Sequence, residues 1–196
     1  MNRIECLEVF AAARGDAAVI VGPGFAGHEL AAAAHSDLTI YNMDMGYAAP
    51  MCLGLALALE PSGRRVVAIE GDGSMLMALP LLTTVGRYPA PNLTILVFDN
   101  GVYLTTGRGA VASATAASGA DLAGMARAAG ATLQVAAPTS LDEFRSAIAS
   151  AMTRDGPWVI VASVDASDRH DPRARQHFTT DIPDQAALFR RALRRS

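Results

Sequence analysis

Residues 66–74 read VVAIEGDGS, an apolar run that ends in a glycine-rich turn. A helical pattern follows over residues 75–87, and a second apolar run, NLTILVFD, occupies residues 92–99. Apolar runs rich in valine and isoleucine that alternate with helical patterns are typical of βαβ units in a parallel sheet. The stretch therefore predicts two neighbouring parallel strands, at residues 65–70 and 92–99, joined by a helix.

The same alternation extends over most of the chain and predicts a single α/β domain spanning residues 1–196. The expected fold is a doubly wound, mainly parallel sheet of about six strands with helices on both faces. The remaining strands are predicted at residues 17–21, 38–41, 132–135 and 158–165, and the remaining helices at residues 4–14, 27–34, 48–59, 121–129, 141–153 and 185–194. Residues 101–119 show no periodicity, and a loop of that length within a domain is typical of a mobile active-site segment.

The composition argues against several classes of protein. With 51% hydrophobic and 18% charged residues and a net charge of −3, we expect a globular chain that does not bind nucleic acid. The longest apolar run, residues 48–59, is shorter than the roughly 18–20 residues that a membrane span needs. The first residues lack the pattern of a secretory signal, and Cys6 and Cys52 fall in different predicted helices, so free thiols and a cytoplasmic location are expected.

Three strand-to-helix turns mark the expected binding site, because ligands in open α/β sheets lie outside the carboxyl ends of the strands. They read GPGFAG at residues 22–27, GDGS at residues 71–74 and DNGVY at residues 99–103. Glycine-rich turns that open helices can present backbone N–H groups to phosphate, although such glycines also simply permit tight turns.

Asp72 and Asn100 follow two apolar runs that we expect to be adjacent strands, so their side chains should emerge side by side at one edge of the sheet. One carboxylate and one amide oxygen, together with a backbone carbonyl, make an oxygen site suited to Mg²⁺. The alternative is structural, since Asp72 could cap the following helix and Asn100 could occupy a turn.

The order Gly71-Asp72-Gly73, with Asn100 about 28 residues later, resembles the motif of enzymes that use thiamine diphosphate. Residues 71–77 and 96–103 look most like sulfopyruvate and phosphonopyruvate decarboxylases, and residues 24–30 are similar to a loop of the same two families. The likeness covers about residues 17–152. It implies the domain that binds the diphosphate of the cofactor, and it implies thiamine diphosphate and Mg²⁺ as cofactors.

The resemblance implies a role for each residue that matches the motif. Mg²⁺ would be bound by the side chains of Asp72 and Asn100 and by the backbone carbonyl of Val102. The residues implied to bind the cofactor in these turns are Gly24, Gly71, Asp72, Gly73, Ser74 and Asn100.

Further positions are implied around the reactive end of the cofactor. Met45 stands where the family places a bulky apolar residue that bends the cofactor, although such a methionine is also an ordinary core residue. Tyr103 and Leu104 would line the edge of the cofactor or substrate. His28 and Arg108 are weaker candidates for binding an anionic group of the substrate, since a lone arginine in a loop is more often solvated.

The implied activity is decarboxylation of a small 2-oxo acid resembling sulfopyruvate or phosphonopyruvate. In the family, a glutamate on a separate pyrimidine-binding domain activates the cofactor, and a chain of 196 residues has no room for that domain. We therefore expect no catalytic residue on this chain, and Glu29, Glu60 and Glu70 are not expected to replace the missing glutamate. A pyrimidine-binding subunit of the alpha type would supply it, in a hetero-oligomer built on dimers, across an exposed apolar face.

Two other functions remain open at this stage, and so does a degenerate subunit that binds the cofactor without turnover. A split carboligase resembling acetolactate synthase would pass the same carbanion to a second carbonyl compound. A flavodoxin-like binding module, without catalysis, would use residues 71–74 merely as a tight turn.

Overall fold

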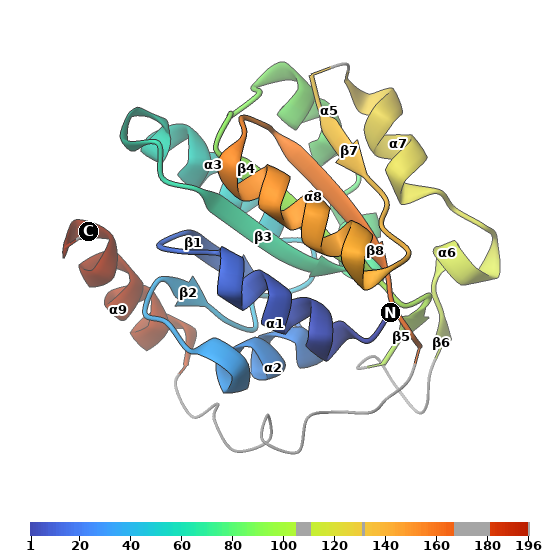
Figure 1. The fold of residues 1–196 in the computed structure, drawn as a ribbon, viewed down its shortest axis with the longest axis horizontal. Helices are drawn as coiled ribbons and strands as arrows, with labels where there is room; N and C mark the ends of the chain where they lie inside the picture. Colours follow the sequence, from blue (N-terminus) through green and yellow to red (C-terminus); the bar gives the residue numbers. More distant parts are fainter. Residues whose placement is uncertain (105–110, 131, 167–180, 196) are drawn as a thin grey trace.

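A computed structural model describes residues 1–104, 111–130, 132–166 and 181–195. Its centre is a six-stranded sheet in which every adjacent pair of strands is parallel. In spatial order the strands are β2 (Thr39–Ile40), β1 (Ala18–Val21), β3 (Val66–Gly71), β4 (Leu93–Asp99), β8 (Trp158–Ser163) and β7 (Gln134–Ala136). The predicted parallel sheet is confirmed (Figure 1).

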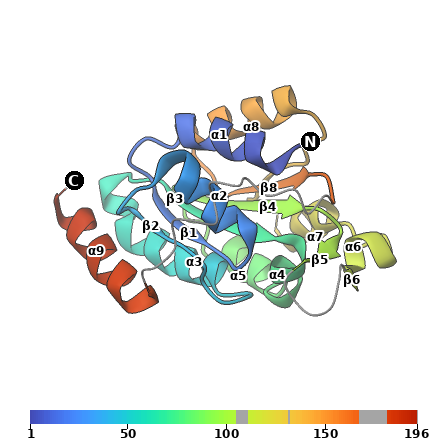
Figure 2. The same cartoon turned by 90° about the horizontal axis from the view of Figure 1, so that it is seen from below.

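Helices cover both faces of this sheet (Figure 2). Their bounds are α1 Arg3–Ala13, α2 Phe25–Ala34, α3 Ala48–Leu59, α4 Asp72–Met77, α5 Leu81–Arg87, α7 Leu122–Ala129, α8 Leu141–Thr153 and α9 Ile182–Arg195, with a short 3-10 turn at Glu60–Ser62 after α3. Helices α1, α2 and α8 pack on one face, and α3, α5 and α7 pack on the other. The fold is therefore doubly wound, as predicted.

Except for the edge strand β7, the strands of the sheet are buried on both faces, which explains why they read as continuous apolar runs rather than as alternating ones. Along β3, Val66 and Ala68 belong to the core under α3 and α5, whereas Val67 and Ile69 belong to the core under α1 and α8. Cys52 and Cys6 lie in these two separate cores as free thiols, as expected, and burial raises the pKa of Cys6 to about 11.

The strand order reverses beside β1, and this reversal positions the site. The chain passes from β1 to β2 on one side and then returns to β3 on the other side of β1. Connections that leave adjacent strands in opposite directions open a crevice at the carboxyl ends of those strands. The turn after β1 and the turn after β3 therefore flank a crevice, which results from the strand order alone.

One expectation about local structure is wrong. The helix predicted over residues 75–87 is broken into α4 and α5, because Pro80 has no N–H to continue the first helix and instead precedes the first residue of the second. Within the segment 101–119, the described residues form β5 (Val102–Tyr103), which pairs antiparallel with β6 (Val111–Ala112), and a helical turn, α6 (Ala114–Ala117), while the mobility of this segment stays a prediction. These elements are too short to produce a detectable periodicity.

Among the described residues, no helix combines the length and the apolar composition that crossing a membrane requires.

Candidate functional site

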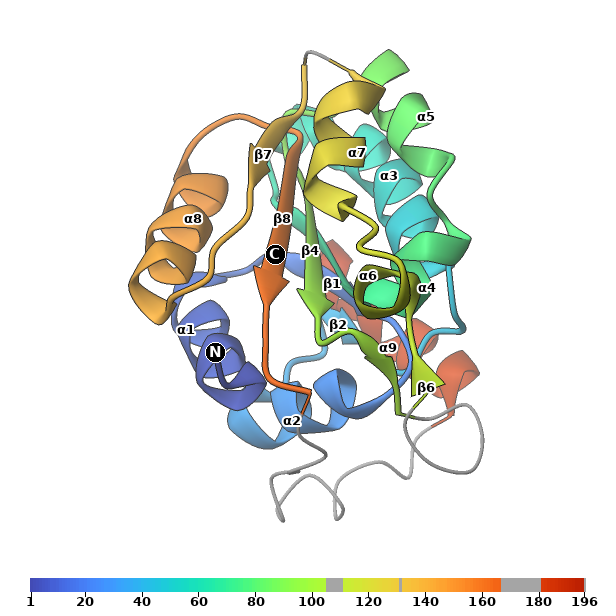
Figure 3. The same cartoon turned by 90° about the vertical axis from the view of Figure 1, so that its right-hand side faces the viewer.

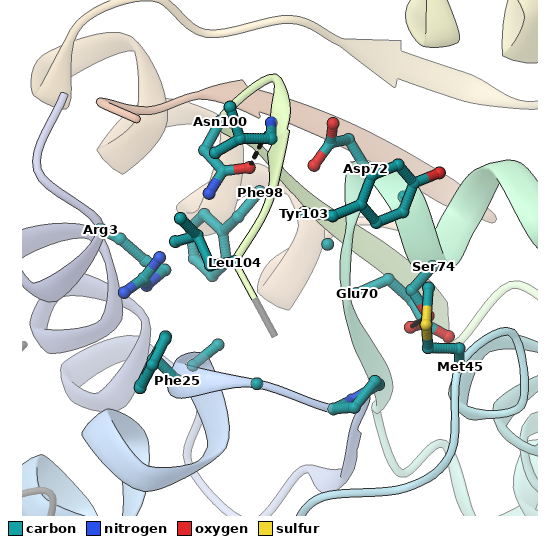
Figure 4. Close-up of a pocket in the computed structure, with 16 residues that line it drawn as sticks. Arg3, Phe25, Met45, Glu70, Asp72, Ser74, Phe98, Asn100, Tyr103 and Leu104 are labelled. Carbon is teal, nitrogen blue, oxygen red and sulfur yellow. Dashed lines mark hydrogen bonds between the residues drawn. The ribbon is translucent and has the colours of Figure 1, made fainter. Parts of the chain in front are cut away.

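A pocket lies at the carboxyl ends of β1, β3 and β4, where the strand order reverses (Figure 4). It brings together every residue that the sequence predicted to hold the cofactor or its metal. These are Gly24, Met45, Gly71, Asp72, Gly73, Ser74, Asn100, Val102, Tyr103 and Leu104. The predicted neighbourhood of the two strand ends is confirmed, since Gly71 of β3 pairs with Phe98 of β4, directly before the Asp99–Asn100 turn.

Asp72 does not cap α4, as the structural alternative required. It is the first residue of the helix, and the N-cap is Gly71, which makes no side-chain hydrogen bond. Instead the Asp72 side chain is buried, and its Oδ2 accepts a very short hydrogen bond from the Ser113 hydroxyl. The Thr115 hydroxyl lies 3.1 Å from the same oxygen. The carboxylate is therefore held in a fixed orientation at the pocket by two hydroxyls that lie 41 and 43 residues further along the chain.

Ser113 and Thr115 were missed by the sequence analysis. They reach Asp72 because the β5–β6 pairing folds the chain back across the turn, and the Ser113 N–H donates to the Gly101 carbonyl at 2.8 Å. Figure 3 shows β6 and α6 beside α4. The only signal in the sequence was the abundance of serine and threonine in this segment, which does not say which hydroxyls meet a carboxylate.

Asp99 extends the same polar cluster. The Thr115 hydroxyl lies 2.8 Å from Asp99 Oδ1, so it stands between two carboxylates. Burial raises the pKa of Asp99, and the nearby Asp72 adds to this rise, while the hydrogen bond with Thr115 opposes it. Burial is the main cause of the raised pKa, so the Asp99 carboxyl is partly withdrawn from water beside Asp72.

Asn100 occupies a turn, as the structural alternative expected, and it also lines the pocket. Its Oδ1 accepts the N–H of Val102 at 3.1 Å, which forms the turn expected of an asparagine at a strand end. Gly101 between them has a φ of +70°, a backbone conformation that favours glycine. The turn keeps the amide of Asn100 and the backbone of Val102 against the pocket, so the structural role does not remove Asn100 from the candidate site.

Gly73 allows a close approach that no other residue would permit. A Cβ built on Gly73 would overlap the ring of Tyr103, which lies across the turn. The backbone of the turn and the aromatic ring therefore share one wall of the pocket, as Figure 4 shows for the Tyr103 side chain beside Asp72.

Ser74 joins the turn to the loop that carries Met45. Its Oγ accepts the N–H of Gly46 at 2.9 Å and donates to Glu70 Oε2 at 2.5 Å. The other oxygen of Glu70 accepts the N–H of Ala49 at 3.1 Å, in the first turn of α3. Glu70 thus ties together β3, α4 and α3 beneath the pocket, a role that the sequence did not reveal.

Glu70 also provides a test of pH dependence. Burial raises the pKa of its carboxyl, despite the hydrogen bonds from Ser74 and from the backbone of Ala49 and Ala48. A raised pKa in the folded state means that stability is greatest while the group is protonated and falls as the pH rises through that pKa. We expect Glu70→Gln to flatten this fall, so that the variant loses less unfolding free energy than the wild type between pH 5 and pH 8. Urea unfolding across this range measures it, and parallel curves would contradict it.

Gly24 provides the third turn of the pocket. It is the N-cap of α2 with a φ of +105°, in a region that glycine adopts readily and other residues do not. Gly24 has no side chain with which to cap this helix, and the positive N-terminal end of α2 lies at the pocket, which Gly24, Phe25 and Ala26 line.

Of the two residues predicted for the substrate, the structure places His28 alone, and His28 does not line the pocket. His28 lies on α2 outside the lining residues, with its Nε2 3.2 Å from the side-chain nitrogen of Asn42. Arg108 lies outside the described residues. A basic residue that the sequence analysis did not select, Arg3, lines the pocket instead.

The donors at the pocket fit the predicted metal and cofactor. A carboxylate, an amide oxygen and a backbone carbonyl are the hard oxygen ligands that Mg²⁺ prefers, and Mg²⁺ commonly completes its shell with water and substrate phosphates. Within the described part of the chain, no group of three or more His, Cys, Asp or Glu residues could hold a metal by itself. Asp72, Asn100 and Val102 would therefore hold the ion together with phosphate oxygens.

Comparison with known proteins identifies the family of the chain. Residues 27–162 match the family described as thiamine pyrophosphate enzyme, C-terminal TPP binding domain. Phosphonopyruvate decarboxylase of Streptomyces viridochromogenes is 41% identical over 161 residues, which are 81% of this chain and 38% of that protein. Sulfopyruvate decarboxylase subunit beta of Methanococcus maripaludis is 27% identical over 88% of this chain and 89% of its own length.

Solved structures share the fold over most of the chain. A putative thiamin diphosphate-dependent enzyme from Mycobacterium smegmatis superposes with a TM-score of 0.71 at 24% identity, over 84% of this chain and 32% of that one. Benzoylformate decarboxylase from Polynucleobacter necessarius gives 0.70 at 22% identity, over 85% and 33%. This chain spans about two fifths of the phosphonopyruvate decarboxylase and about a third of these enzymes. The chain belongs to the thiamine pyrophosphate enzymes, and residues 27–162 are their C-terminal TPP-binding domain.

Proposed function

We propose that this chain is the part of a thiamine diphosphate-dependent 2-oxo acid decarboxylase that binds the cofactor diphosphate and Mg²⁺. The observation that carries the proposal is the pocket at the strand reversal, where Asp72, Asn100 and Val102 line the same cavity as Met45. A flavodoxin-like module has no need for a buried carboxylate held by two hydroxyls at this position.

The residues of this chain would bind, orient and shield the cofactor. Asp72, Asn100 and the Val102 carbonyl would hold Mg²⁺, and the turns at Gly24 and at Gly73–Ser74 would contact the diphosphate. Met45, tied down through Gly46 and Ser74, would support the bent cofactor. When bound, the cofactor supplies the electron sink that allows a 2-oxo acid to lose CO₂.

The substrate proposed is a 2-oxo acid with a second anionic group, of the sulfopyruvate or phosphonopyruvate type. The support is the names of relatives, which are phosphonopyruvate decarboxylase and sulfopyruvate decarboxylase subunit beta. These names favour decarboxylation over carboligation. Product analysis with one and with two carbonyl substrates separates the two reactions, since a carboligase would form a new carbon–carbon bond.

The glutamate that activates the cofactor is proposed to come from a pyrimidine-binding partner subunit. Glu70 and Glu29 already have partners within this chain. Glu70 accepts hydrogen bonds from Ser74 and from the first turn of α3, and Glu29 is paired with Arg3. Beside the pocket, Tyr47 and Met77 expose 59% and 63% of their surfaces. Exposed apolar side chains next to an incomplete site favour a partner subunit at this face, in a hetero-oligomer built on dimers.

Calorimetric titration of thiamine diphosphate with Mg²⁺ tests the proposal, first on this chain and then on its mixture with the product of the neighbouring gene. We expect binding to appear or to tighten sharply in the mixture, and the mixture to release CO₂ from a 2-oxo acid. Binding that is equally tight without the partner would contradict the shared site. Absence of binding in a mixture that forms a stable complex would contradict the assignment of the pocket.

A further inference from the structure

Arg3 is the basic side chain that lines the pocket. It is the first residue of α1, and its side chain is 10% exposed. Figure 4 shows its guanidinium near Phe25, Leu104 and Asn100, at the end of the pocket opposite Met45. Arg3 precedes the residues that match the family, which begin at residue 27, so that match assigns it no role.

Glu29 holds the guanidinium in a defined orientation. Arg3 Nε donates to Glu29 Oε2 at 2.7 Å and Nη2 donates to Oε1 at 2.8 Å, which is the bidentate arrangement of an arginine with a carboxylate. The Glu29 side chain is fully buried. A guanidinium carries five N–H groups, and within the described residues these two bonds use two of them. The remaining donors belong to a planar group whose orientation is already fixed.

The position of Arg3 suits a phosphate. The side chain lines the same pocket as Phe25, the first residue of α2, so a fixed cation and the positive end of a ten-residue helix meet at one end of the pocket. Across the pocket, the metal site at Asp72 and Asn100 would neutralise one part of a diphosphate. A second phosphate lying toward α2 would need its own positive partner, because burying an unpaired charge is costly.

We infer that Arg3 is a recognition residue for the phosphate of thiamine diphosphate that lies toward α2, and that Glu29 is the positioning residue that presents it. The inference rests on the proposed function, because it assumes that the pocket binds the diphosphate. It adds to that function a preference of the pocket for a diphosphate over a monophosphate. Arg3 would provide this preference, while Mg²⁺ and the backbone N–H groups would also bind the phosphates.

The test compares the affinities of thiamine diphosphate and thiamine monophosphate, with Mg²⁺ present, by calorimetry on the preparation in which the wild type binds the cofactor. We expect Arg3→Gln to weaken binding of the diphosphate by about 10- to 100-fold, the range for loss of a hydrogen bond to a charged group, and to change monophosphate binding much less. Arg3→Lys retains the charge without the planar pair of donors, so we expect it to recover part of the preference.

Two further variants keep the test decisive. Arg3→Gln leaves the buried Glu29 unpaired, so the double change Arg3→Gln with Glu29→Gln restores a neutral pair, and we expect its melting temperature to recover but not its preference for the diphosphate. Arg87→Gln is the matched control, since Arg87 is exposed at the end of α5 and does not line the pocket.

The failure of this inference differs from the failure of the proposed function. If the wild type binds thiamine diphosphate and Arg3→Gln weakens both ligands by the same factor, or neither, then Arg3 is a structural residue and the inference is wrong. If the wild type binds neither ligand even with its partner, the proposed function itself is wrong.

Discussion

Replacement of Asp72 by alanine is expected to abolish Mg²⁺-dependent binding of thiamine diphosphate while the domain stays folded. Asp72 is the carboxylate in the proposed donor set, and its orientation is fixed by Ser113 and Thr115. Loss of an outer-shell partner of a metal commonly costs about 10- to 100-fold in affinity, so loss of a direct carboxylate ligand should exceed about 100-fold. Calorimetry with Mg²⁺ held at a fixed concentration measures the loss.

The fold should survive because the Asp72 side chain makes no helix cap and contributes no apolar surface to the core. Thermal unfolding by circular dichroism should remain cooperative. Asp142→Ala is the matched control, because Asp142 is an exposed acid in the first turn of α8 and lies outside the pocket. An unchanged cofactor affinity in folded Asp72→Ala would remove Asp72 from the metal site.

Removal of the two hydroxyls behind Asp72 is expected to weaken Mg²⁺ binding by about 10- to 100-fold, the range for outer-shell partners of metal ligands. The double variant Ser113→Ala with Thr115→Val deletes both hydroxyls that contact Asp72 Oδ2 and also the contact with Asp99. Without them the carboxylate can rotate away from the ion. The affinity for Mg²⁺ is measured by titration at a saturating cofactor concentration.

Two controls separate positioning of Asp72 from folding of the segment. Ser118→Ala removes an exposed hydroxyl of the same segment that donates only to the Ala114 carbonyl, so it should leave the affinity unchanged. The double variant Ser113→Ala with Thr115→Ser keeps a hydroxyl at residue 115, unlike Ser113→Ala with Thr115→Val. We therefore expect it to recover part of the lost affinity for Mg²⁺. If the double variant binds Mg²⁺ as tightly as the wild type, the hydroxyls serve only to anchor the segment.

The elements of the sheet could be predicted because their signal is local. Strands buried on both faces must be apolar at every position, and this produces the continuous runs at residues 66–69 and 93–98. The turn residues could also be recognised from the sequence, since Gly71, Asp72 and Asn100 come just after those runs. Parallel pairing then places adjacent strand ends together, so Asp72 and Asn100 could be expected from the sequence to lie at one site.

The break at Pro80 was missed even though its cause lies in the sequence. The apolar pattern of residues 75–87 continues across the proline, so periodicity alone favoured a single helix. A proline without a backbone N–H ends one helix and starts the next, and the break separates the short α4, whose first turn lines the pocket, from α5, which packs on the core. The conformational restriction that Pro80 imposes on the backbone therefore outweighed the helical pattern of residues 75–87.

The sequence by itself determined the succession of the six sheet strands along the chain, the membership of the family and the residues of the three turns. Each of these depends on neighbours along the chain. Tertiary structure alone decided which distant groups serve the site. Ser113 lies 41 residues from Asp72 and Glu29 lies 26 residues from Arg3, and each pair meets only when hairpin and helix packing close the intervening chain. A hydroxyl or a guanidinium carries no periodic signal, since its role is defined by the charge it faces after folding.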